Sequence, residues 1–245
     1  MTSPLDRLKS FTRARIALGR AGDALPTQAL LDLSLAHAFA RDAIHSDVNW
    51  QAMADQLAPL PSVMVTSAAS DKTTYLRRPD LGRVLAKGEA ERLPQGPFDI
   101  VCVMGDGLSA EACMGYAAAT WRATLPLLSG FSIAPVILAR GARVALSDEI
   151  GAAMGAALVI LLIGERPGLS NSDSLGAYLT FAPRPGRKDS ERNCISNIHG
   201  HGLAPERAAQ KIAWLAREAL RLKLTGIDLK EDAPDGALPA PPASS

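Results

Sequence analysis

The sequence has little of what marks several classes of protein. Aromatic residues make up only 4% of the 245 residues, which argues against stacking platforms for nucleic-acid bases. The formal net charge of +1 gives no electrostatic attraction to nucleic acid or to an anionic membrane surface. The longest apolar run, residues 156–163, is far shorter than the roughly 20 residues of a transmembrane helix. We therefore expect no nucleic-acid partner and no membrane partner.

Cysteine is scarce as well. Its three copies, Cys102, Cys113 and Cys194, form no C-x-x-C pair and no other spacing typical of a metal site. The first residues lack the apolar segment of a secretory signal, and an odd number of cysteines is typical of reduced thiols. We expect a cytoplasmic protein that provides no metal ligands.

The sequence does contain an alternation of helix and strand patterns. Apolar positions recur at helical spacing over residues 26–44, with His37 on the apolar side as a partly buried histidine, and residues 45–90 are polar and interrupted by proline. Strands are predicted at 98–104, 132–139 and 157–163, with two further candidates at 178–181 and 194–198. Helices are predicted at 109–128, 147–154 and 204–224, the last ending before Gly226.

Apolar strands that alternate with helices predict an α/β fold, a Rossmann-like parallel sheet with helices on both faces. We expect a mostly helical N-terminal region over residues 1–90, the sheet domain over residues 91–232 and a disordered, proline-rich tail over residues 233–245. Ligands of such sheets bind beyond the carboxyl ends of the strands, so the loops that follow the strands are the candidate site.

The loop over residues 105–110, GDGLSA, fits the G-x-G-x-x-A dinucleotide fingerprint between a strand and a helix. Arg140, at the end of the next predicted strand, suits a 2′-phosphate better than a ribose hydroxyl. The alternative is a tight turn in which Ser109 caps the helix. An NADP-dependent oxidoreductase is thus one interpretation, and a non-catalytic interaction module is another.

Two later loops also carry polar groups. In residues 164–170, GERPGLS, Glu165 and Arg166 either orient a polar ligand or lie in solvent on a Pro-Gly turn. Residues 191–199, ERNCISNIH, surround a short predicted strand with polar groups. Cys194 in that segment is by itself more often an inert buried thiol than a functional one.

Taken together and in order, segments from about residue 8 to 230 resemble the light chain of ethanolamine ammonia-lyase. Any one of these segments is weak evidence, but their occurrence in the same order as in that family is specific. The segments are FTRARI at 11–16, GRAG at 19–22, PT at 26–27, SDK at 70–72, YLRRPDLGR at 75–83, DGLS at 106–109, RV at 143–144, DEIG at 148–151, GERPGL at 164–169 and CISNI at 194–198.

The resemblance implies a Rossmann-like domain after a small helical N-terminal part. It also implies that the chain binds adenosylcobalamin against a TIM-barrel heavy chain, which holds ethanolamine. In that family the cobalt–carbon bond breaks homolytically, and ethanolamine becomes acetaldehyde and ammonia. We therefore expect a light subunit in a hetero-oligomer of several heavy and light chains, an ammonia-lyase that is active only with its heavy subunit.

By motif, Val144, Glu165 and Cys194 match cobalamin-contact positions of the family. Asp106, Gly107 and Ser109 are additional candidates for cofactor binding. The resemblance assigns no catalytic residue to this chain, because the substrate-binding residues belong to the heavy chain.

Residues 197–202, NIHGHG, approach the D-x-H-x-x-G motif by which other cobalamin enzymes bind cobalt through a histidine. Asn197 stands in place of the aspartate that would orient the imidazole, so we expect His199 and His201 to be ordinary loop histidines. Cobalt would then keep its own benzimidazole, which is the base-on form. The long N-terminal extension that some light chains carry is not seen, which leaves packaging into a bacterial microcompartment open.

Overall fold

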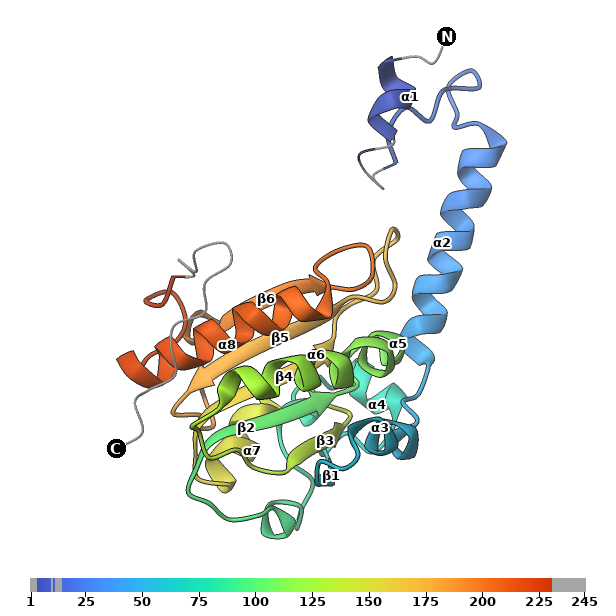
Figure 1. The fold of residues 1–245 in the computed structure, drawn as a ribbon. Helices are drawn as coiled ribbons and strands as arrows, with labels where there is room; N and C mark the ends of the chain where they lie inside the picture. The colour runs from blue at the N-terminus through green and yellow to red at the C-terminus, as the bar shows by residue number, and fades with distance from the viewer. Residues whose placement is uncertain (1–3, 10, 12–14, 231–245) are drawn as a thin grey trace.

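The computed structural model of the chain describes residues 4–9, 11 and 15–230, and Figure 1 shows its course. These residues form a six-stranded sheet with the order β1-β3-β2-β4-β5-β6. Its strands are β1 (Ser62–Thr66), β2 (Phe98–Gly105), β3 (Val136–Arg140), β4 (Ala156–Gly164), β5 (Leu175–Phe181) and β6 (Asn193–Ile198). The α-helices are α1 (Pro4–Lys9), α2 (Thr27–His45), α3 (Trp50–Leu57), α4 (Lys72–Arg77), α5 (Ala110–Ala112), α6 (Ala118–Thr124), α7 (Leu146–Ala153) and α8 (Pro205–Leu222). The tail predicted at 233–245 lies outside the described residues.

The predicted α/β class is confirmed, with one difference in the direction of the strands. β1, β3, β2 and β4 are parallel to one another, whereas β5 is antiparallel to β4 and β6 is antiparallel to β5. The sheet is therefore mixed, where the sequence predicted a parallel one. Only residues 165–174 separate β4 from β5, and a parallel crossover needs about a dozen residues or more.

Strand β1 was not predicted, because its apolar pattern is weak. It is a five-residue edge strand directly after Pro61, in the stretch expected to be polar and irregular. Val65 is buried, but Met64 beside it is 40% exposed. Met64 and Val65 point to opposite faces of the sheet, and at this edge the face that carries Val65 is better covered.

Helices cover both faces of the sheet, as predicted. On one face, Trp121 of α6 and Ile212 of α8 are buried with Ile160 of β4. On the other face, Ile150 of α7 is buried with Val159 of β4. Successive residues of a strand point to opposite faces, so β4 contributes to both layers of the core and its sequence is apolar throughout.

Helix α2 is different, because it extends away from the sheet and its covering helices (Figure 1). Its C-terminal part packs next to α5, where Ala40 and Ala43 are buried. His37, predicted to be partly buried, is exposed. Nowhere in the described residues is there a helix that is both long and apolar enough to cross a membrane.

Candidate functional site

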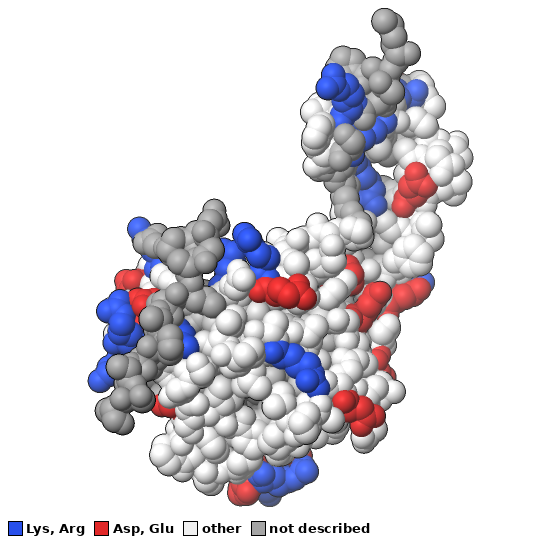
Figure 2. All heavy atoms as spheres, in the orientation of Figure 1, with Lys and Arg blue, Asp and Glu red and all other residues white. Residues whose placement is uncertain are grey.

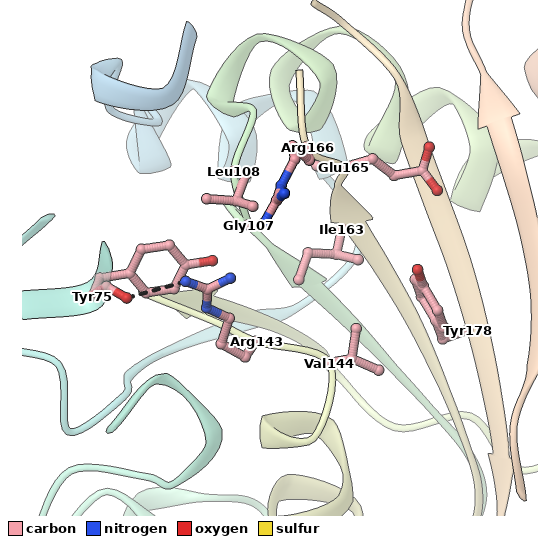
Figure 3. A pocket seen from close by; sticks show the side chains of 10 residues that line it. Tyr75, Gly107, Leu108, Arg143, Val144, Ile163, Glu165, Arg166 and Tyr178 are labelled. Carbon is pink, nitrogen blue, oxygen red and sulfur yellow. Dashed lines mark hydrogen bonds between the residues drawn. The ribbon is translucent and has the colours of Figure 1, made fainter. Parts of the chain in front are cut away.

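A cavity of about 400 Å³ opens at the carboxyl edge of the parallel strands, where the fold predicts a ligand site (Figure 3). Four parts of the chain meet there: helix α4, the loop after β2, the loop after β3 and the end of β4. Strand β5 closes the remaining side. The lining residues are Tyr75, Gly107, Leu108, Arg143, Val144, Ile163, Gly164, Glu165, Arg166 and Tyr178.

Asp106 holds the turn after β3 at this edge of the sheet. Its carboxylate is buried and accepts hydrogen bonds from the backbone N–H groups of Gly141 and Ala142, at 2.9 Å each. Burial raises the pKa of the Asp106 carboxyl, and these backbone donors act in the opposite direction. Because Arg143 and Val144 follow directly, Asp106 positions the turn that carries both of them to the cavity.

The glycines of the predicted fingerprint serve the packing of the loop against β4. A Cβ on Gly107, which has a φ of +57°, would lie 2.1 Å from the carbonyl oxygen of Gly164. A Cβ on Gly164 would in turn lie 2.0 Å from the carbonyl oxygen of Ser109. The backbones are therefore in direct contact, and the glycines are explained without a nucleotide phosphate.

Ser109 has the structural role that the sequence offered as an alternative. Its hydroxyl oxygen accepts a hydrogen bond from the N–H of Ala112 at the start of α5, and its O–H donates to the carbonyl oxygen of Ser172, at 2.9 Å. The residue is fully buried and does not line the cavity. Of the three additional candidates, Gly107 reaches the cavity, while Asp106 and Ser109 hold the loops around it.

Glu165 is half-buried and oriented by a neighbour. One of its carboxylate oxygens accepts a hydrogen bond of 2.6 Å from the hydroxyl of Ser174. The other lies over Gly176, where an added Cβ would approach it to 2.7 Å. Figure 3 shows the side chains of Glu165 and Arg143 directed to opposite sides of the cavity. Glu165 is therefore an oriented hydrogen-bond acceptor at the cavity. The side chain of Arg166 beside it is exposed.

Cys194 lies one strand further along the sheet. It pairs with Tyr178 across β5 and β6, and Tyr178 rather than Cys194 lines the cavity. Burial raises the pKa of the Tyr178 phenol, which therefore stays a neutral hydroxyl. The structure thus brings Val144 and Glu165 to one cavity and places exposed Cys194 at its margin, behind Tyr178.

Tyr75 and Arg143, which line the cavity and contact each other, were not among the site residues predicted from the sequence. The guanidinium carbon of Arg143 lies 4.2 Å from the centroid of the Tyr75 ring, and its Nη2 donates to the carbonyl oxygen of Tyr75 at 3.1 Å. The Tyr75 hydroxyl donates to the carbonyl oxygen of Ala142, at 3.0 Å. Both residues lie in segments that carry the resemblance, but their contact joins positions far apart in the chain.

Lys72 adds a second positive charge on the same side. Its ammonium lies 5.2 Å from the centroid of the Tyr75 ring and donates to the carbonyl oxygen of Gly107, at 3.4 Å. Burial lowers the pKa of Lys72, and the negative charge of Asp106 opposes that shift.

His199 does not line the cavity. It is 3% exposed, and its Nδ1 accepts from the backbone N–H of His201 at 3.3 Å. Its Nε2 lies 3.4 Å from the amide nitrogen of Asn171. Both ring nitrogens therefore have neighbours within the protein, and neither neighbour is the carboxylate that orients a metal-binding imidazole.

Comparison with known proteins decides the family. The family model for the ethanolamine ammonia-lyase light chain (EutC) matches residues 2–230. The chain belongs to the ethanolamine ammonia-lyase light-chain family. Ethanolamine ammonia-lyase small subunits of Bradyrhizobium diazoefficiens and Rhodopseudomonas palustris are 52% and 51% identical to it, over 94% and 92% of this chain and 91% and 89% of theirs. That of Xanthomonas campestris is 49% identical over 95% of this chain and 90% of its own.

Membership in the ethanolamine ammonia-lyase light-chain family confirms the resemblance found in the sequence. The name small subunit implies that these relatives have a larger partner subunit. Nothing in the loop after β2 favours the NADP-dependent alternative, because Gly107 and Gly164 are in contact with protein backbone and Arg140 is exposed and does not line the main cavity.

Proposed function

We propose that this chain is the light subunit of an adenosylcobalamin-dependent ethanolamine ammonia-lyase, and that the cavity at the carboxyl edge of the sheet holds one side of the cofactor. One observation carries the proposal: Val144 and Glu165, two positions that match cobalamin contacts of the family, line the same cavity although the chain separates them by a helix and a strand.

The chemistry of the cavity suits cobalamin, which has amide arms, a phosphodiester and an apolar benzimidazole. Val144, Ile163 and Leu108 offer apolar surface, and Glu165 offers an acceptor for an amide or a hydroxyl. The Nε of Arg143 is buried and has no hydrogen-bond partner in the described part of the chain. A buried donor without a partner is costly, so a ligand oxygen at this place would be favourable.

The size of the cavity bears on the partner. A volume of about 400 Å³ is in the range of a pocket for a small drug-sized molecule, and cobalamin is much larger. Only part of the cofactor fits on this chain, so the rest needs cover from another surface. A TIM-barrel heavy subunit that also holds ethanolamine would provide that cover.

Helix α2 offers a surface for such a subunit. Leu30, Leu31, Leu35 and Phe39 are each more than half exposed, and Figure 2 shows few charges over the middle of this helix on the face in view. The segment before α2 also reaches the loop after β4, because the guanidinium of Arg15 donates to the carbonyl oxygen of Leu169, at 2.9 Å. A single large partner could therefore cover both the cofactor and the apolar arm that α2 forms.

In the proposed enzyme, bound adenosylcobalamin supplies the carbon radical that takes a hydrogen atom from ethanolamine. The residues of this chain bind and orient the cofactor, and none of them acts as an acid or base on the substrate. Glu165 accepts from an amide arm or a hydroxyl, the turn held by Asp106 presents Val144, and His199 stays off the cobalt. Ethanolamine would contact the heavy subunit alone.

Co-expression with the heavy subunit tests the proposal. We expect the purified complex to bind adenosylcobalamin, seen in its visible spectrum, and to release acetaldehyde from ethanolamine. We expect the isolated chain to release none under the same conditions. Turnover by the isolated chain, or a complex that binds no cobalamin, would contradict the proposal.

A further inference from the structure

Two arginines and one glutamate line the cavity, so positive charge exceeds negative charge there. Within the described residues, neither Arg143 nor Arg166 forms an ion pair, although both line the cavity. The guanidinium of Arg143 has the carbonyl oxygen of Tyr75 as its acceptor, while its Nε has none. Unpaired guanidinium groups at a concave surface favour an anionic ligand group.

The carboxylates nearby do not neutralise these groups. Asp106 lies beneath the cavity with its oxygens occupied by backbone N–H groups of three residues. Glu165 accepts from Ser174 and extends away from Arg143 (Figure 3). Lys72 reinforces the positive side through its position at the Tyr75 ring. The region between Arg143 and Arg166 therefore has an excess of positive charge.

Arg143 is also held ready to bind. Its guanidinium lies on the ring of Tyr75, and the turn that carries it is fixed by Asp106 through Gly141 and Ala142. A guanidinium that is already oriented loses little side-chain freedom on binding, and its planar donors match the oxygens of a phosphate.

The next step rests on the proposed function. One face of the corrin ring carries the adenosyl group, which must face the substrate and therefore the heavy subunit. The opposite face carries the benzimidazole, which is tethered to the ring through a phosphodiester. That negatively charged group consequently lies on the side of the cofactor that this chain would cover.

We propose that Arg143 and Arg166, which both line the cavity, bind the phosphodiester of the cobalamin nucleotide arm. Arg143 is then a specificity-determining residue that distinguishes a complete cobalamin from a corrinoid without its nucleotide. Arg166 contributes less, because its side chain is exposed and no hydrogen bond or ion pair holds it within the described residues.

Two corrinoids separate this role from a structural one. Cyanocobalamin has the nucleotide arm, and cobinamide has the same corrin ring without it. For the complex with the heavy subunit, we expect Arg143→Gln to weaken cyanocobalamin binding about 10- to 100-fold, as for the loss of a charge-assisted hydrogen bond. Binding of cobinamide should change by less than about twofold, since it has no phosphate to lose. Spectroscopic titration gives both dissociation constants.

Matched variants complete the experiment. Arg140→Gln removes an exposed arginine at the end of β3 that does not line the main cavity, and it should leave both dissociation constants unchanged. Arg143→Lys keeps the charge and loses the planar donors, so its cyanocobalamin affinity should lie between those of the parent and Arg143→Gln. Co-purification of each variant with the heavy subunit checks that it folds.

The outcomes are distinguishable. An equal loss of affinity for both corrinoids would mean that Arg143 acts only by supporting the turn, and it would overturn the inference, as would unchanged binding of both. If the unmodified complex binds neither corrinoid, the proposed function itself fails and this inference with it.

Discussion

Two helices of nearly equal length differ in whether their apolar side chains are buried or exposed. α8 has 18 residues, and its apolar residues Ala209, Ile212 and Ala216 are buried against the sheet. α2 has 19 residues, yet Leu35 and Phe39 are 54% and 58% exposed. α8 is strongly amphipathic and finds its apolar partner within the chain. α2 has apolar residues on most sides, which is typical of a helix that is surrounded by protein.

The comparison shows that the chain buries the apolar residues of one helix in its own core and leaves those of the other exposed. The sheet and its covering helices form a closed core, whereas the arm formed by α2 exposes several large apolar side chains in a row. Apolar patches of this kind on a soluble protein mark interaction surfaces. Interior substitutions should therefore affect stability, and substitutions in the arm should affect assembly.

The largest effect is expected from polar substitutions in the arm. Leu31, Leu35 and Phe39 follow one another at four-residue spacing and so lie on one side of α2. Burial of each is worth about 1.5–3 kcal/mol, so replacing all three by glutamine should weaken association with the heavy subunit about a thousandfold or more. Analytical ultracentrifugation of the mixed subunits measures this. Gln28→Ala with Ser34→Ala is the control on the same helix, and an unchanged complex in the triple variant would contradict the role of the arm.

A pair of alanine substitutions tests the comparison directly. Ile212→Ala in α8 should lower the free energy of unfolding of the isolated chain by about 2–5 kcal/mol, because it leaves a cavity beside Ile160 and Trp121. Leu35→Ala in α2 should change it by less than about 0.5 kcal/mol, as for other exposed positions. Urea unfolding followed by circular dichroism gives both values. Comparable losses in the two variants would show that α2 is already covered within the chain.

A substitution in the cavity separates cofactor binding from assembly. Glu165→Ala should raise the cobalamin dissociation constant of the assembled enzyme about 10- to 100-fold, since a charge-assisted hydrogen bond is worth about 1.5–3 kcal/mol. It should leave association with the heavy subunit unchanged, which is the reverse of the effect expected in α2.

The control for this cavity variant is Glu111→Ala, which removes an exposed glutamate from α5. Its cobalamin affinity should equal that of the parent in the same spectroscopic titration. An unchanged dissociation constant for Glu165→Ala would return Glu165 to the interpretation in which its charge lies in solvent.

The sequence predicted best those elements whose surroundings are uniform. β2 and β4 are buried on both faces, and their continuous apolar runs predicted their positions to within a residue or so. The carboxyl-end rule predicted the edge at which the cavity opens, and Val144 and Glu165, predicted from the resemblance, both line that cavity. The contact between Tyr75 and Arg143 was not predictable in this way, because periodicity does not show which residues 68 positions apart will meet.

Other differences arise where direction or context decides the structure. β1 alternates too weakly for recognition, and the direction of β5 depends on the length of the connection before it. α8 ends at Leu222, where Lys223 follows with a left-handed φ of +59°, and not directly before the predicted Gly226. Gly226 is needed a little later, where a Cβ would lie 2.1 Å from the carbonyl oxygen of Ser190. The exposure of α2 depends on which other elements pack against it, and the local sequence of the helix does not show this.

The smallest expected effect concerns the caps at the starts of the helices. It also distinguishes the arm formed by α2 from the body, that is, the sheet and its neighbouring helices. Asp71 caps α4, and the backbone N–H of Thr74, followed by the hydroxyl of Ser70, lowers the pKa of its carboxyl from 3.8 to about 2. α2 begins at Pro26 with no side-chain cap and no acidic residue in its first turn. A carboxyl with a lowered pKa stabilises the fold above its ordinary pKa, and that stability is lost as the pH falls toward 2. The body should therefore lose stability between about pH 4 and pH 2 through Asp71, and α2 should contribute nothing comparable.

Asparagine and alanine at position 71 separate the cap from its charge. Asp71→Asn keeps a good capping side chain without a titrating group, so unfolding of the isolated chain should depend less steeply on pH over this range than in the parent. Asp71→Ala should be less stable than the parent at pH 5, because the N–H of Thr74 loses its acceptor. Urea unfolding at pH 5, 4 and 3 measures both effects. Since α4 carries Lys72 and Tyr75 to the cavity, Asp71→Ala should also weaken cobalamin binding slightly in the assembled enzyme. Identical pH slopes in the parent and Asp71→Asn would show that the carboxylate charge is not what stabilises the start of α4.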